Sequence, residues 1–175
     1  MPKTNSLAEA NAAAYDPRNP LIVQSDRSLL LEVHNPFYEV ARAAISPFAE
    51  LEKSPEHIHT YRLTPLSLWN AAATGLSAEA MCDALTRFAK YPVPQNVLAD
   101  IADLVGRWGR VRLLKEDGEL RLESEDAALL AELARHKSVK PYLGAPLSAE
   151  AFHVPLQFRG ALKQALIAVG WPVED

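Results

Sequence analysis

The stretch from Pro94 to Ser124 places the strongest constraint on how this chain can fold. Apolar residues recur at helical spacing through its first half, and two alternating segments follow on either side of an Asp117-Gly118 turn. The pattern predicts a helix that leads into a two-stranded hairpin. The apolar positions are Val97, Leu98, Ile101, Leu104, Val105 and Trp108 on the helix, and Val111, Leu113, Leu120 and Leu122 on the hairpin.

Two shorter helices are expected immediately before this stretch. Thr64-Pro65 has the cap-then-proline pattern of a helix start, and Gly75 ends that helix. Ser77 caps the next helix. Three helices followed by a hairpin is the order of a winged helix, a unit that often docks onto nucleic acid or another protein.

The rest of the chain also combines short strands with helices. Hairpins are expected over residues 21–33 and 48–63, separated by a helix that Asn35-Pro36 opens. After the winged-helix-like unit, a helix capped by Ser124, a strand near residue 153 and a closing helix over 160–169 follow. The predicted fold class is therefore α+β: short β-hairpins packed with helices, then the winged-helix-like unit, then a C-terminal strand and helix.

One ordered domain is expected over residues 20–175, in three sections: 20–64, 65–124 and 125–175. With 49% apolar and 23% charged residues, the chain can bury a core. Residues 1–19 are rich in Ala, Asn, Ser and Pro and hold few sizeable apolar groups. They are predicted to form a disordered arm.

Charge and cysteine content limit the partners and the compartment. A net charge of −4 opposes a protein that coats nucleic acid over its whole surface, so such contact needs a local basic cluster. A single cysteine, Cys82, cannot form an internal disulfide and favours a reducing, cytoplasmic setting. No stretch approaches the roughly 18 consecutive apolar residues of a membrane span, and no membrane contact is expected.

The sequence contains no recognisable catalytic motif. No glycine is followed by lysine, so a P-loop cannot be built, and neither Gly-x-Gly-x-x-Gly nor Gly-x-Ser-x-Gly occurs. His57-x-His59, with His34 elsewhere, is the only group that resembles metal ligands, but a third ligand is not evident. We therefore predict no catalytic residues, no metal, no cofactor and no enzymatic activity by this chain alone.

The densest basic stretch runs from residue 104 to residue 115. It contains Arg107, Arg110, Arg112 and Lys115 and no acidic residue, which suggests a tentative site for a DNA backbone. The alternative is a solvated face whose charges pair with nearby acids: Asp100, Asp103, Glu116 and Glu123. Both interpretations stay open here. Further along, Trp171 is better placed for an interface than for the core.

Several runs of residues resemble the N-terminal domain of XPB-type DNA repair helicases, and above all the bacterial members. The resemblance covers about Pro20 to Asp175, and its most specific part is Tyr-Arg-Leu-Thr-Pro-Leu-Ser-Leu-Trp, which combines strand, cap and helix. The runs are 20–26, 56–71, 93–95, 109–111 and 170–175.

The resemblance implies that this domain precedes an ATP-dependent core, which moves along DNA and opens it. The phosphate-binding and Asp-Glu-x-His motifs of such a core are missing from this sequence, so the chain is expected to be a fragment or a free-standing copy of the leading domain. In eukaryotic members the corresponding domain pairs with a similar domain on a neighbouring subunit and regulates the ATPase.

The resemblance therefore implies a non-catalytic docking and regulatory domain. Its expected partners are the helicase core, in the same or a separate chain, with DNA and a regulatory protein as further candidates. The alternative function is direct DNA binding through the basic stretch on the helix and wing.

Overall fold

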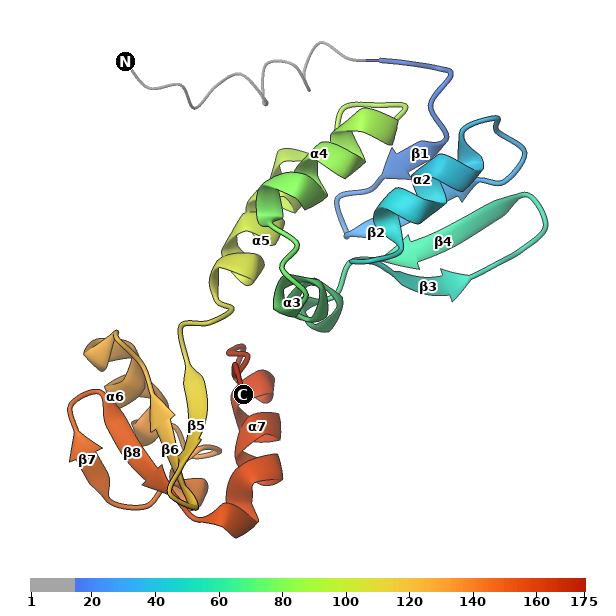
Figure 1. Cartoon of the computed structure of the whole chain (residues 1–175). Helices are drawn as coiled ribbons and strands as arrows, with labels where there is room; N and C mark the ends of the chain where they lie inside the picture. The colour runs from blue at the N-terminus through green and yellow to red at the C-terminus, as the bar shows by residue number, and fades with distance from the viewer. Residues whose placement is uncertain (1–14) are drawn as a thin grey trace, which may run out of the picture. The chain divides into compact units, whose positions relative to one another are not determined.

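The computed structural model describes residues 15–175, and the chain divides into two compact units, Met1–Gly106 and Arg107–Asp175 (Figure 1). Within the described residues, each unit holds a four-stranded antiparallel sheet and helices, which confirms the predicted α+β class. Residues 1–14 of the predicted disordered arm lie outside the described part. The end of that arm is attached to the first unit, because Asn19 Nδ2 donates to the carbonyl oxygens of Arg87 and Ala89, each at 3.0 Å.

The sheet of the first unit joins the two expected hairpins. Its strands follow the order β1-β2-β4-β3, and β2 pairs with β4 along its full length. Arg27, in the turn between β1 and β2, has a φ of 71°, which suits the left-handed position after a type I turn. The strands are β1 (Leu21–Val23), β2 (Ser28–Glu32), β3 (Glu50–Lys53) and β4 (Ile58–Arg62).

The helices of the first unit begin at local capping signals. Thr64 and Ser67 form a reciprocal capping box at α3, and the Ser77 side chain accepts a hydrogen bond from Ala80 N at α4. One helix starts later than expected: Asn35 caps a turn, accepting from Phe37 N at 2.8 Å, and α2 begins only after it. The helices are α2 (Tyr38–Ile45), α3 (Pro65–Ala73), α4 (Ala78–Phe88) and α5 (Gln95–Gly106).

The core of the first unit lies between the sheet and these helices. Trp69 is 3% exposed, and its Nε1 donates to the Leu104 carbonyl oxygen at 2.8 Å, which ties α3 to α5. The fully buried side chains include Leu21, Leu29, Leu31, Ile45, Leu68, Met81, Leu85 and Ile101. No helix among residues 15–175 combines the length and apolarity that crossing a bilayer requires.

The second unit has its own sheet and its own core. The strands follow the order β5-β6-β8-β7, and the buried residues include Val111, Leu120, Leu122, Leu130, Leu162 and Leu166. The strands are β5 (Arg112–Glu116), β6 (Glu119–Glu123), β7 (Pro146–Ser148) and β8 (Ala151–Val154). The helices are α6 (Ala127–Arg135), α7 (Arg159–Ala168) and two short 3-10 turns, η1 (Lys140–Tyr142) and η2 (Leu156–Phe158).

The elements of the expected winged-helix-like unit all form, but they are divided between the two units. Helices α3, α4 and α5 belong to the first unit, whereas the hairpin β5-β6 belongs to the second. The reason is a non-local pairing: β6 also pairs with β8, and the apolar side of the hairpin is buried with residues of α6 and α7. The boundary between the units lies at Gly106, inside the predicted 65–124 section.

One edge of the second sheet is covered by the 170–175 segment. Glu174 forms an isolated parallel bridge with Arg112 at the edge strand β5. Leu113 N donates to the Glu174 carbonyl oxygen at 2.8 Å, and Glu174 N donates to the Val111 carbonyl oxygen at 3.0 Å. These bonds satisfy backbone groups that an open edge would leave exposed.

Candidate functional site

The four residues predicted to contact DNA, Arg107, Arg110, Arg112 and Lys115, all lie in the second unit. Arg107 and Arg110 occupy the loop that leads into β5, and Arg112 and Lys115 lie on that strand. We call these four residues the basic patch. The structure therefore places the patch on the entry to the hairpin and not on the helix α5, which ends at Gly106.

Arg107 is engaged by the 170–175 segment. Its Nη1 donates to the Gly170 carbonyl oxygen at 2.7 Å, and its guanidinium lies 5.1 Å from the centre of the Trp171 ring. Gly170 has a φ of +93°, and a Cβ there would lie 2.9 Å from the same Nη1. The end of the Arg107 side chain could shift, so it is the positive φ that favours glycine at this position.

Arg110 contacts both Trp171 of the 170–175 segment and Asp126 at the start of α6. Its guanidinium lies 5.2 Å from the Trp171 ring centre, and its Nη2 lies 2.5 Å from Asp126 Oδ2. Asp126 is also the N-cap of α6, because its Oδ1 accepts from Leu129 N at 3.0 Å. The sequence had indicated Ser124 as the cap, but the Ser124 hydroxyl oxygen accepts from Asp126 N instead.

Arg112 lines a surface cleft of the second unit. The cleft has a volume of about 620 Å³ and is also lined by Gly109, Arg110, Glu174 and the start of α6. Lys115 is exposed on β5. Two of the four predicted acidic partners, Glu116 and Glu123, both pair with Arg121, at 2.9 and 2.6 Å.

The 170–175 segment is anchored at its end by Asp175. This carboxylate accepts from Arg159 at 2.5 Å and from Lys163 at 3.0 Å, both on α7. Burial raises the pKa of Asp175, but the hydrogen bonds from the two cations outweigh it and hold the pKa below its usual value. The sequence analysis did not predict that the 170–175 segment contacts Arg107, because residues 107 and 171 lie far apart in the chain.

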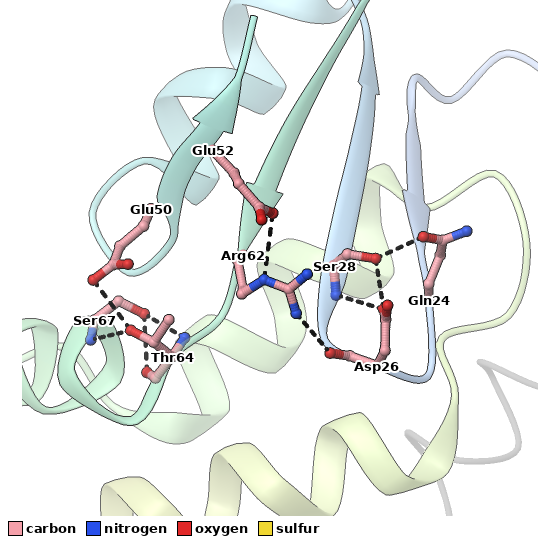
Figure 2. A network of polar contacts seen from close by, with 8 residues as sticks. All are labelled: Gln24, Asp26, Ser28, Glu50, Glu52, Arg62, Thr64 and Ser67. Atoms are coloured by element: carbon pink, nitrogen blue, oxygen red, sulfur yellow. Dashed lines mark hydrogen bonds and ion pairs between the residues drawn. The ribbon is translucent and has the colours of Figure 1, made fainter.

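A second polar network lies in the first unit, where two of the runs that carry the family resemblance meet (Figure 2). Asp26 accepts from the Ser28 hydroxyl at 2.5 Å and from Ser28 N at 3.0 Å, and these hydrogen bonds lower the pKa of Asp26. Arg62 donates from Nη1 to the Asp26 carbonyl oxygen and from Nε to Glu52, each at 3.3 Å.

A separate group of hydrogen bonds lies at the start of α3. The Thr64 hydroxyl donates to Glu50 Oε1 at 3.2 Å, while its oxygen accepts from Ser67 N at 2.9 Å (Figure 2). These bonds join β3 to the helix start. Because the polar side chains bind one another, both groups act as structural connections between elements.

The histidines noted in the sequence have separate partners. His57 Nδ1 lies 2.9 Å from His34 Nε2, whereas His59 Nδ1 lies 3.2 Å from the Tyr38 hydroxyl. His57 and His59 thus do not converge on one point. Over residues 15–175, no group of three or more His, Cys, Asp or Glu side chains is arranged to hold a metal ion.

The chain is thus an α+β protein of two units, and the polar groups described above are arginines and carboxylates at its surface. A family model described as "Helicase conserved C-terminal domain" matches residues 21–148, and the chain belongs to this helicase family.

Bacterial relatives match almost the whole chain. It is 51% identical to the "DNA 3'-5' helicase XPB" of Mycobacterium tuberculosis over 157 residues, which is 89% of this chain and 29% of the relative. It is 52% identical to the protein of the same description from Kineococcus radiotolerans, over 89% of this chain and 28% of that relative.

A eukaryotic relative is more distant. It is the "General transcription and DNA repair factor IIH helicase/translocase subunit XPB" of Schizosaccharomyces pombe, 31% identical over 66% of this chain and 14% of its own length. The resemblance to XPB-type helicases is thus confirmed, and the chain spans less than a third of these bacterial relatives. The family description names a C-terminal domain, whereas the resemblance had implied an N-terminal domain.

Proposed function

We propose that this chain is a non-catalytic docking and regulatory domain of an XPB-type ATP-dependent DNA helicase acting in DNA repair, and that it lies on the N-terminal side of the ATPase core. The observation that carries the proposal is the partial coverage: 89% of the chain matches, but only 29% of the Mycobacterium tuberculosis helicase. The phosphate-binding motif that ATP hydrolysis needs is absent from the sequence. The matched region would therefore serve an activity that resides elsewhere in the enzyme.

The polar groups of the first unit support this function. Arg62 binds Asp26 in the turn before β2, and Thr64 binds Glu50 and so holds the sheet to α3, as a rigid platform for another protein would require. Exposed apolar side chains in the same unit, among them Phe37, Val40 and Leu66, offer surface for such a contact.

The test uses a full-length bacterial XPB-type helicase and a variant that lacks the region aligned with residues 20–175. We expect the variant to retain basal ATP hydrolysis and to lose the coupling of hydrolysis to strand opening. Adding residues 1–175 as a separate chain should restore part of the coupling. Equal unwinding by both enzymes would contradict the proposal, as would loss of basal ATP hydrolysis in a folded variant.

Direct DNA binding through the basic patch is the second candidate function. It is favoured by Arg112, which lines the open cleft, and by the exposed Lys115. Fluorescence anisotropy with forked and duplex DNA should show binding that weakens with salt and with Arg112→Ala plus Lys115→Ala. Lys137→Ala, an exposed cation beyond α6, is the matched control. Absence of binding at low salt, by the unmodified chain and by a Glu174→Gln variant alike, would rule this function out.

A further inference from the structure

The 170–175 segment supplies two kinds of contact to the arginines of the basic patch, and it adds a carboxylate to the cleft that Arg110 and Arg112 line. The Gly170 carbonyl oxygen accepts from Arg107, and the guanidiniums of Arg107 and Arg110 both lie over the Trp171 ring, at 5.1 and 5.2 Å from its centre. The Glu174 carboxylate lies against Gly109, where a Cβ would stand 3.3 Å from Oε2. It lines the same cleft as Arg110 and Arg112.

These groups have the chemistry of a nucleotide. A flat aromatic ring stacked on guanidinium planes occupies the place of a base, since bases stack on arginine in single-stranded complexes. The Glu174 carboxylate, in the cleft that Arg110 and Arg112 also line, stands for a backbone phosphate, since arginine binds both oxyanions through the same geometry. The ring and the carboxylate are three residues apart on one extended segment.

We propose that the 170–175 segment is an internal mimic of single-stranded nucleic acid, and that it covers a binding surface made by Arg107, Arg110 and Arg112. This inference rests on the second candidate function, direct DNA binding, and adds how that binding is restrained. The segment competes with a nucleotide for the same guanidiniums. Nucleic acid then binds only when the indole and the carboxylate are displaced.

Displacement does not require the segment to leave the sheet. Its backbone is held by the hydrogen bonds to Val111 and Leu113, and Val173 is buried in the core of the unit. The two competing side chains are less constrained, because Glu174 is exposed and Trp171 is half-buried. Rotation of these side chains would expose the guanidiniums of Arg107 and Arg110.

The test compares two variants of the full chain with the unmodified protein. Glu174→Gln removes the competing charge, and Trp171→Ala removes the ring that the two guanidiniums contact. The probe is fluorescein-labelled oligothymidine, titrated at low salt and followed by anisotropy. We expect each variant to bind several-fold more tightly than the unmodified chain, with a gain that shrinks as salt rises.

Two controls make the result specific. Glu132→Gln removes an equal charge from an exposed position on α6 and should leave affinity unchanged. Arg112→Ala, added to Glu174→Gln, should abolish the gain. Thermal unfolding of every variant reports whether the second unit remains folded, and Glu174→Gln carries the test if Trp171→Ala does not fold.

The outcomes separate the proposals. If the unmodified chain binds the oligonucleotide as tightly as Glu174→Gln does, direct binding stands and the mimic is wrong. If no variant binds, both direct binding and the mimic fail, while the docking function is unaffected. A gain that survives Arg112→Ala would also overturn the mimic, because the DNA would then be bound elsewhere.

Discussion

At the scale of single residues, Asp126 shows how one carboxylate serves two structural roles. One oxygen caps α6 by accepting from Leu129 N, and the other pairs with Arg110, which in turn stacks on Trp171. Arg110, one of the four residues predicted to contact DNA, is thereby part of the packing of the second unit. Its charge is balanced locally, so its removal should affect stability as well as any binding.

Substitutions at Asp126 should separate the cap from the ion pair. Asp126→Ala should lower the free energy of unfolding by about 1 kcal/mol, since the first turn of α6 loses its acceptor. Asp126→Asn keeps a capping oxygen and should cost less, because partly exposed ion pairs contribute little. Denaturant titration measures both. Equal losses for the two variants would mean that the ion pair, and not the cap, dominates.

Asp26 gives a prediction for the effect of pH on stability. Hydrogen bonds from Ser28 lower the pKa of Asp26 in the folded protein, so the ionised form favours folding. The contribution is complete above the unfolded pKa of about 3.9 and is lost as pH falls through the lower folded value. In urea titrations over this acidic range, Asp26→Asn should lose less stability on acidification than the unmodified chain. Parallel curves would contradict it.

At the scale of elements, helices α3, α4 and α6 begin at side-chain caps, and the cap of α3 is the most complete. Thr64 accepts from Ser67 N, Ser67 accepts from Thr64 N, and Pro65 takes the first helical position. Thr64 also donates to Glu50, which links the helix start to β3. The cap therefore supports both the helix and its attachment to the sheet.

Loss of the Thr64 hydroxyl should weaken both the start of α3 and its attachment to β3. Thr64→Ala should lower the free energy of unfolding by about 1 kcal/mol, whereas Thr64→Ser, which keeps the hydroxyl, should cost less. Chemical denaturation provides the free energies, and amide exchange at Ser67 and Leu68 reports on the first turn. Similar stability of the two variants would show that the hydroxyl is not what stabilises this start.

At the scale of the whole molecule, apolar residues gather in two separate clusters, one in each unit. The first contains Leu29, Leu68 and Leu85, and the second contains Leu122, Leu130 and Leu166. A hydrophobic cluster is stabilised by contacts among its own members. Damage to one cluster should therefore be confined to its own unit.

A substitution in α7 tests this independence. Leu166 is fully buried, so Leu166→Ala should destabilise the second unit by about 2 to 5 kcal/mol. Hydrogen exchange should rise across residues 107–175 and stay unchanged in the first unit. Leu85→Ala should give the opposite distribution. A rise in exchange throughout the chain after either substitution would show that the units unfold together.

What the sequence determined by itself is local. Capping residues, helical spacing and the Asp117-Gly118 turn act over a few residues, and they correctly predicted α3, α4, α5 and the β5-β6 hairpin. The XPB-type resemblance was likewise carried by continuous runs.

The tertiary structure alone decided which elements join and which arginines are engaged. The hairpin pairs with β8 inside the second unit, whereas the three helices belong to the first, and Trp171 contacts both Arg107 and Arg110. These partners are separated by tens of residues. Their contacts depend on burial and strand pairing across the whole unit, which no local pattern encodes.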